Sequence, residues 1–204
     1  MESALKAGIA LFNEGYYHAA HDAWEERWLA LESGADDERF LHGLIQYTAA
    51  VYHEQQGNPE GARGLAESAQ EYLAGLEATY RDVALDPLRD QLTKIAKGSA
   101  TREILRLTYR DRPLTFDDLD DEATWIVANI LAAEDDRWSE PTVAAAIDSA
   151  HGETTTGRFR VMLRDFVRER ARRGLIYGRL EAHLDRERGR NSGIEDLFED
   201  TDQE

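Results

Sequence analysis

The longest segment without an Asp, Glu, Lys or Arg residue, FLHGLIQYTAAVYH at 40–53, constrains the fold more than any other feature. On a helical wheel, large apolar side chains lie on both flanks of this segment, and a narrow stripe of small and polar residues runs between them. A helix that is apolar on both flanks is buried. The segment is also too short to span a bilayer, which takes about 20 apolar residues. It therefore predicts the central helix of a folded domain.

Glycine and proline signals divide the rest of the chain into further helices. In GNPEGA, Asn58 is placed to cap a helix that has Pro59 at its first position, and Asp86 with Pro87 repeats this signal. We expect helices over about 3–13, 17–31, 38–56, 58–80, 86–98, 101–109 and 122–133, one that starts near Pro141, and Arg-rich helices after the GETTTG break. Convincing strand alternation and a fixed-period repeat are both lacking. The predicted fold class is all-α, a compact multi-helix bundle of antiparallel helix hairpins.

The segment RDRPLTFDDLDD at 110–121 is the least helical and marks the predicted domain boundary. We expect a helical bundle over 1–110, a helical C-terminal extension over 111–190 packed on that bundle, and an acidic mobile tail over 191–204. Residues 158–190 carry 11 Arg and five acidic residues, but apolar residues alternate with them at helical spacing. This pattern favours a helix that docks its apolar face and pairs its arginines with acidic groups, rather than one that binds nucleic acid.

The overall charge of the chain indicates the kind of cell in which the protein works. The chain has 41 acidic and 24 basic residues, of which only three are lysines, and its net charge is −17. Such a chain repels itself in dilute buffer, and concentrated salt screens that repulsion. We therefore expect a cytoplasmic protein of a halophile. No charged-then-apolar segment follows Met1, so we expect no secretory signal. The chain has no cysteine, which excludes disulfides, thiolate nucleophiles and Cys-based zinc sites.

The segment HDAWEERW at 21–28 places a polar pair among large aromatic residues. At about 100° per residue, His21 and Glu25 share one helix face with three aromatics, while alanines lie on the opposite side. The sequence predicts that the His21 face is the inner one. The three aromatics are Tyr17, Trp24 and Trp28.

The neighbouring helix over 40–53 has its own polar stripe, made of His42, Gly43, Gln46, Ala49, Ala50 and His53. A short loop makes the two helices antiparallel, and the paths from this loop back to His21 and forward to Gln46 are both about 10 Å. His21 and Glu25 should then lie opposite Gln46, with His53 about two turns further along. Buried polar groups need partners, because burying one without a partner costs about 1–3 kcal/mol.

The segments LFNEGYYHAAHDAWEERW and RFLHGLIQYTAAVYHEQQGNPEGA resemble the family called domain of unknown function 309. The resemblance covers roughly residues 8–80 and implies a small helical bundle, with no established activity. Asp22 and His42 depart from the family pattern, which usually has Glu and Gln at these positions. The residues that fit the pattern are His21, Glu25, Trp28, Arg39, Gly43, Gln46 and His53.

Three classes of function remain open for these residues. In the first, His21, Glu25 and Gln46, with Arg39 as a counter-ion, form a structural network that fixes helix register. In the second, the protein is an enzyme in which Glu25 orients His21 and water is the nucleophile, so that the reaction is a hydrolysis. Trp28, Arg39, Gln46 and His53 are then candidate binding residues.

A metal variant of the second class uses His21, Glu25 and His53 as a two-His, one-carboxylate set, although the spacing commits us to no metal ligands. The third class is a helical module that binds a protein or a nucleic acid. A small molecule or a metal is an open partner, a membrane is not expected, and the cofactor and the oligomeric state are left open.

Overall fold

The computed structural model describes residues 1–99, 104–153 and 157–199, with the backbone alone for 190–199. The chain divides into two compact units, Met1–Ile130 and Leu131–Glu204. The boundary predicted near residue 110 falls inside the first unit. Among the described residues, no helix is both long enough and apolar enough to cross a membrane.

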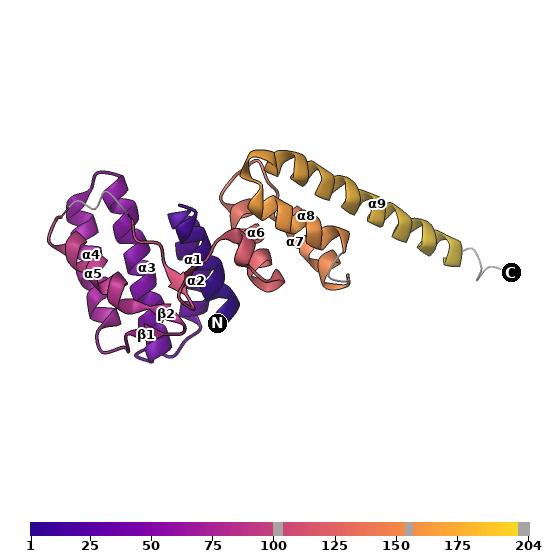
Figure 1. Cartoon of the computed structure of the whole chain (residues 1–204). Helices are drawn as coiled ribbons and strands as arrows, with labels where there is room; N and C mark the ends of the chain where they lie inside the picture. Colours follow the sequence, from indigo (N-terminus) through magenta and orange to yellow (C-terminus); the bar gives the residue numbers. More distant parts are fainter. Residues whose placement is uncertain (100–103, 154–156, 200–204) are drawn as a thin grey trace. The chain divides into compact units, whose positions relative to one another are not determined.

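Five helices that follow one another along the chain form the body of the first unit (Figure 1). Each packs on the next, and α3 has the most extensive packing because α2 and α4 both lie against it. The all-α prediction is confirmed, and α3 begins and ends close to its predicted limits. The helices are α1 (Glu2–Asn13), α2 (Tyr17–Leu29), α3 (Asp36–Gln55), α4 (Pro59–Leu73) and α5 (Leu85–Ala96).

The burial of α3 follows from its sequence. Large side chains on both of its flanks are almost inaccessible, as the pattern predicts, except Tyr52, which is 44% exposed. Between them, a Cβ atom at Gly43 would lie 2.6 Å from the Leu73 side chain, so the missing side chain lets α4 approach closely. The fully buried large residues of α3 are Phe40, Leu41, Leu44 and Tyr47.

Two short hairpins form a small antiparallel sheet of order β1-β2-β3-β4, which the sequence did not predict. The strands are β1 (Thr79–Tyr80), β2 (Val83–Ala84), β3 (Thr108–Tyr109) and β4 (Arg112–Pro113). The predicted helix over 58–80 is therefore wrong beyond Leu73. The predicted helix over 101–109 is wrong for 104–109, and 101–103 lie outside the described residues.

Both hairpins turn on the same tetrapeptide, TYRD, at 79–82 and at 108–111. The Arg and Asp of each copy have positive φ angles between 49° and 63°. Two consecutive residues with positive φ are typical of the type I′ turn, whose twist matches that of the paired strands. Asp is tolerated in this conformation, whereas Arg rarely adopts it, so propensity alone gives little sign of these turns.

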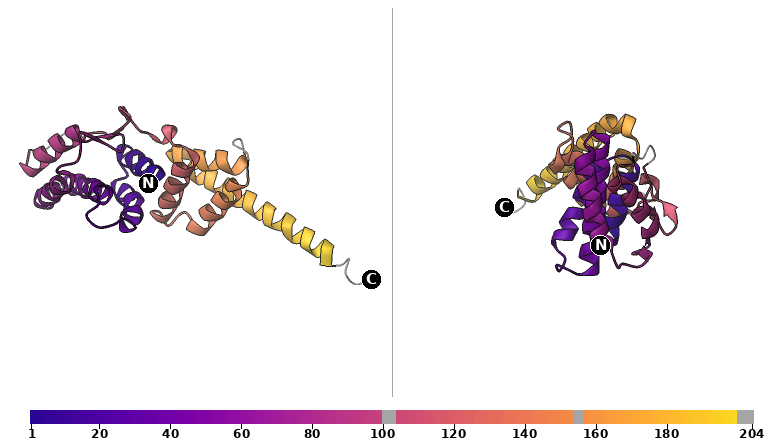
Figure 2. Two further views of the ribbon diagram at one scale, coloured as in Figure 1. Left: turned by 90° about the horizontal axis from the view of Figure 1, so that it is seen from below. Right: turned by 90° about the vertical axis from the view of Figure 1, so that its left-hand side faces the viewer.

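The remaining elements begin with a 3-10 turn, Phe116–Asp118, and α6 (Asp121–Ala133), which crosses the division between the units. The second unit then contains α7 (Glu140–His151), α8 (Arg158–Arg168), a 3-10 turn (Arg170–Arg172) and α9 (Arg173–Glu199). Figure 2 shows α9 extending beyond α7 and α8. Residues 191–199 continue this helix, while 200–204 lie outside the described part, so the mobility of the acidic tail stays a prediction.

The Arg-rich helix α8 packs through its apolar face, as its pattern predicts. One arginine of the basic segment has a structural role, because Arg173 is buried beneath the end of α8. Its guanidinium donates to the carbonyls of Phe166 and Val167 at 2.8 and 3.1 Å, and these carbonyls have no partner within the helix. The buried apolar residues of α8 are Phe159, Met162, Leu163, Phe166 and Val167.

Candidate functional site

The orientation of α2 determines which of its polar side chains are exposed and therefore able to contact a ligand. Its buried residues are three alanines and Trp24, and a Cβ atom at Gly8 of α1 would lie only 2.1 Å from the Trp24 indole. The missing side chain at Gly8 thus leaves room for the Trp24 indole between α1 and α2. The prediction that His21 and Glu25 lie on the inner face is therefore wrong, since their side chains are 34% and 45% exposed.

The imidazole of His21 is held by the carboxylate of the next residue, Asp22. Its Nδ1 lies 3.2 Å from Oδ1 of Asp22 and 4.0 Å from Oε2 of Glu25. The other oxygen of Asp22 lies 3.5 Å from Nδ1 of His18, so Asp22 sits between two imidazoles. If neutral His21 donates from Nδ1 to Asp22, its other nitrogen is a proton acceptor. We call His18, His21, Asp22 and Glu25 the His21 cluster.

A hollow of about 130 Å³ lies beside this cluster, between α2 and α3, and we call it the α2–α3 hollow. It brings together His21 and His53, two of the residues singled out in the sequence. Neither Gln46 nor Arg39 lines it. Its lining residues are Tyr17, His18, His21, Thr48, Ala49, Tyr52 and His53.

The proton on His53 is placed by Asn58, the N-cap of α4. Oδ1 of Asn58 accepts the backbone N–H of Gly61 at 3.0 Å, which fixes the orientation of the amide. Its amide nitrogen then faces Nδ1 of His53 at 2.9 Å. Because the amide nitrogen donates, Nδ1 accepts, and neutral His53 must carry its hydrogen on Nε2. His53 therefore offers a donor, which does not suit the alternative in which His53 is a metal ligand.

Two hydroxyl groups add to the polar lining of the hollow. Thr48 is 1% exposed, and its Oγ1 has no hydrogen-bond partner among the described residues. The Tyr17 hydroxyl accepts from Gln55 at 3.4 Å, so its own hydrogen remains available. Burial raises the pKa of Tyr17 and keeps the phenol protonated at neutral pH. A buried hydroxyl without a partner is costly, and a bound molecule or water would satisfy it.

A second polar cluster lies closer to the start of α3, and we call it the Glu38 cluster. Oε1 of Glu38 accepts from the Trp28 indole at 2.7 Å and lies 3.5 Å from Nδ1 of His42. The His42 ring stacks on the Tyr72 ring with 3.8 Å between their centroids, and the centroid of the Trp28 ring lies 4.4 Å from that of His42. The Glu38 and His42 side chains are only 12% and 16% exposed. Gln46 contacts His42 at 3.3 Å and extends this cluster.

The electrostatics of Glu38 reflect this enclosure. Burial acts to raise its pKa, but hydrogen bonds from the Trp28 indole and the Gly34 backbone N–H, together with the nearby His42, outweigh burial. The pKa of Glu38 therefore lies below its ordinary value, and the group is an anion at neutral pH. Trp28 and Gln46, two of the candidate binding residues, take part in this enclosed cluster.

Arg39 has its contacts at the two ends of neighbouring helices. Its guanidinium donates to the Ala74 carbonyl just beyond the end of α4 and to Asp36 at 3.4 Å. It therefore joins the start of α3 to the end of α4, and the predicted counter-ion role beside Glu25 is wrong. Sequence reasoning missed Asp22, Glu38, Thr48 and Asn58, although Glu38, His42 and Gln46 repeat at four-residue spacing.

The His21 cluster also contains a candidate set of metal ligands. His21, Asp22 and Glu25 each offer one ligand atom, and these atoms lie within 4.8 Å of one another. One imidazole and two carboxylates suit a divalent transition metal. This set contains Asp22 where the alternative considered from the sequence had His53.

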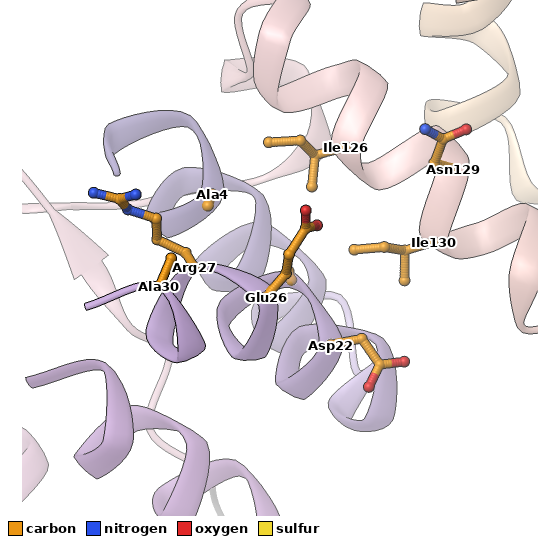
Figure 3. Close-up of a pocket in the computed structure, with 9 residues that line it drawn as sticks. Ala4, Asp22, Glu26, Arg27, Ala30, Ile126, Asn129 and Ile130 are labelled. Atoms are coloured by element: carbon orange, nitrogen blue, oxygen red, sulfur yellow. The ribbon is translucent and has the colours of Figure 1, made fainter. Parts of the chain in front are cut away.

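A larger hollow of about 350 Å³ lies on the other side of α2, near α6 (Figure 3). Arg27 and Glu26 extend from α2 along it, and Ile126 and Ile130 project from α6. Glu26 and Arg27 are exposed, and the hollow has no buried polar group without a partner among the described residues. The smaller α2–α3 hollow is therefore the better candidate for a functional site.

The fold and the hollow together define a class: a helical bundle with a histidine-lined hollow between its second and third helices. Residues 5–65 match the family model described as Domain of unknown function (DUF309). The matched segment runs from α1 into α4 and contains every residue that lines the hollow. No curated protein matches the chain significantly.

Proposed function

We propose that the α2–α3 hollow binds a small molecule and that His21, oriented by Asp22, is its general base. The observation that carries this proposal is the convergence of three histidines on a hollow that also contains the unpartnered hydroxyl of Thr48. A carboxylate that holds one imidazole nitrogen leaves the other nitrogen able to take a proton, which is the usual arrangement in acid–base catalysis.

The solvent exposure of His21, Asp22 and Glu25 favours a functional role for these side chains over a role in stabilising the fold. Ion pairs whose partners are about a third or more exposed contribute roughly 0–1 kcal/mol to stability. The contacts of His21 with Asp22 and Glu25 belong to this class. The structural role that the sequence assigned to His21 and Glu25 suits the enclosed Glu38 cluster better.

The reaction class that these groups support best is hydrolysis by water. The chain has no cysteine, so no thiolate is available as a nucleophile. His21 would take one proton from water as the water oxygen attacks an electrophilic carbon, and would return it to the leaving group. Asp22 would stabilise the imidazolium between these two steps.

A fragment screen by NMR tests the proposed site. Small neutral, anionic and cationic fragments are titrated in concentrated KCl while the signals of Thr48, His21 and His53 are followed. At least one class should shift these signals, and Asp22→Asn should weaken its effect at His21. Glu26→Gln is the matched control, because it removes an equal charge from the same helix outside the hollow. If no class shifts the hollow signals, the proposed site is wrong.

A metal-dependent version of the site is the second candidate, favoured by the closeness of His21, Asp22 and Glu25. Elemental analysis of protein purified in high salt without a metal column tests it. About one zinc, iron or manganese per chain, lost in Glu25→Gln and retained in Glu26→Gln, would support this version. A chain that takes up none of these metals even after incubation with them would refute it.

We also infer that the protein comes from a halophile and works in a salt-rich cytoplasm. We further infer that its second unit is an extension of the family domain. The support for the halophile inference is the net charge of −17 with only three lysines. Dilution from molar KCl into low-salt buffer should lower the melting temperature steeply, because charge repulsion is no longer screened. Circular dichroism at a series of salt concentrations measures this, and an unchanged melting temperature would contradict the inference.

A further inference from the structure

The hydrogen-bonding groups around the α2–α3 hollow narrow the class of ligand. We infer that the hollow takes a small neutral carboxamide, with its carbonyl oxygen toward the donors of His53 and Thr48 and its N–H toward His21. This inference rests on the proposed function and specifies the substrate class of the same site. It follows from a count of donors and acceptors, from charge and from size.

The donors of the hollow are set by contacts outside it. The Asn58 amide occupies Nδ1 of His53 as a donor, which leaves Nε2–H of that ring to donate elsewhere. The Tyr17 hydroxyl already accepts from Gln55 and keeps its own hydrogen for another partner. Thr48 adds a buried hydroxyl with no partner among the described residues. Three donors around one hollow call for a ligand that has an oxygen acceptor.

The acceptor of the hollow comes from α2. Asp22 lies 3.2 Å from Nδ1 of His21, so the second nitrogen of the neutral ring accepts a hydrogen bond. A ligand that matches both sides of the hollow therefore has a carbonyl oxygen and, next to it, an N–H or O–H group. A primary carboxamide has both in one plane. The tyrosine rings and Ala49 supply apolar walls for the rest of the ligand.

Charge and size exclude the obvious relatives of a carboxamide. A carboxylate would enter beside Asp22 and Glu25 in a chain of net charge −17, and like charges repel it. An amidinium has donors only, so it would set its N–H groups against those of His53 and Tyr17. The hollow is about 130 Å³. A cavity of about 150 Å³ holds benzene, so the bound group has roughly six heavy atoms or fewer.

Hydrolysis of such a ligand balances with water alone, once the attacking water has replaced the amide N–H at the second nitrogen of His21, which has a single lone pair. The water oxygen forms the new C–O bond, the C–N bond breaks, and the proton that His21 takes from water goes to the departing nitrogen. The products are a carboxylate and ammonia, which takes up the remaining acid proton as ammonium. The carboxylate product is the charge type that Asp22 and Glu25 repel, and this repulsion favours its release.

Three probes of the same heavy-atom count and different charge test the inference: acetamide, acetate and acetamidinium. Each is titrated into the whole protein in molar KCl at neutral pH, and dissociation constants are taken from the NMR shifts of Thr48 and His53. Acetamide should bind about tenfold more tightly than either ion, which corresponds to one or two hydrogen bonds. Equal or tighter binding of acetate or acetamidinium would overturn the inference.

The variant Thr48→Val removes the hydroxyl and keeps the shape of the side chain. It should fold, because loss of an unpartnered buried hydroxyl is neutral or stabilising. It should weaken acetamide binding about three- to tenfold. Thr79→Val, at an exposed position of β1, is the matched control and should change nothing. Unchanged acetamide binding in Thr48→Val would overturn the role of this donor and with it the inference.

The same data separate failure of the ligand class from failure of the site. If fragments of another class shift the hollow signals and acetamide does not, the carboxamide inference is wrong and the proposed site stands. If no probe or fragment of any class shifts them, both are wrong.

Discussion

The Glu38 cluster and the His21 cluster have the same ingredients, since each places a histidine beside a carboxylate one helical turn away. In the Glu38 cluster the carboxylate is 12% exposed and accepts an indole hydrogen bond at 2.7 Å. In the His21 cluster the carboxylates are 39% and 45% exposed, and their contacts are with imidazoles. Composition therefore does not distinguish the two clusters, but enclosure does.

This difference explains why one cluster suits structure and the other suits chemistry. An enclosed charge must be fully hydrogen-bonded, and removal of one partner leaves an expensive group behind. A half-exposed pair costs little to assemble and little to lose, so it is free to meet a ligand. The predictions that follow test this contrast, in order of decreasing effect on stability.

Glu38→Ala should have the largest effect, a loss of about 2 kcal/mol in the free energy of unfolding, because the Trp28 indole and the Gly34 backbone N–H lose their acceptor. Urea denaturation followed by circular dichroism measures it. Glu26→Ala, at an exposed position of α2, is the control and should stay within about 0.5 kcal/mol of the unsubstituted protein. If both variants have the same stability, Glu38 is not a structural anchor and the contrast fails.

Acid should weaken the Glu38 cluster. The pKa of Glu38 is lower in the folded protein than its ordinary value of 4.5. A lowered pKa contributes stability that is fully present above that ordinary value and is lost as the pH falls through the folded pKa. Glu38→Gln should therefore have a smaller decline in stability below about pH 4.5. Melting temperatures measured across this range check it, and parallel curves would contradict the expected linkage.

Asp22→Asn and Glu25→Gln should each change the free energy of unfolding by less than about 0.5 kcal/mol, because their ion pairs are half-exposed. The same urea experiment measures this. At the same time, Asp22→Asn should weaken the response of His21 to ligand. A loss of 2 kcal/mol or more in either variant would return the His21 cluster to a structural role.

Much of the fold was predictable because the residue pattern of α3 indicates that this helix is buried. Large residues on both flanks, with glycine and alanine between them, require neighbours on two sides, and α2 and α4 occupy these sides. The orientation of α2 was not predictable from aromatic residues alone. Its Trp24 indole lies against Gly8 of α1, and three alanines form the rest of its buried face, which only the pairing of the two helices shows.

The sheet and part of the site escaped prediction for local reasons. Two-residue strands are too short to show alternation, and arginine at a positive φ gives no turn signal, although the repeated TYRD was visible. Asp22 and Glu38 were missed because carboxylates abound in this chain, so that a single acidic residue gives little signal. His42 was set aside as a departure from the family pattern, yet it lies at the centre of the enclosed cluster.

The side-chain amide of Asn58 has two roles: its oxygen caps α4, and its nitrogen determines which ring nitrogen of His53 carries the hydrogen. Replacing the amide nitrogen by oxygen would change the second role and keep the first. Asp is as good an N-cap as Asn, so Asn58→Asp keeps the start of α4. It also turns a donor to His53 into an acceptor, which moves the ring hydrogen to Nδ1 and leaves Nε2 with a lone pair. Across relatives, an Asn-to-Asp exchange here would reverse the polarity of the hollow and keep the fold. A substitution that passes for neutral in a sequence comparison would then mark a change of substrate.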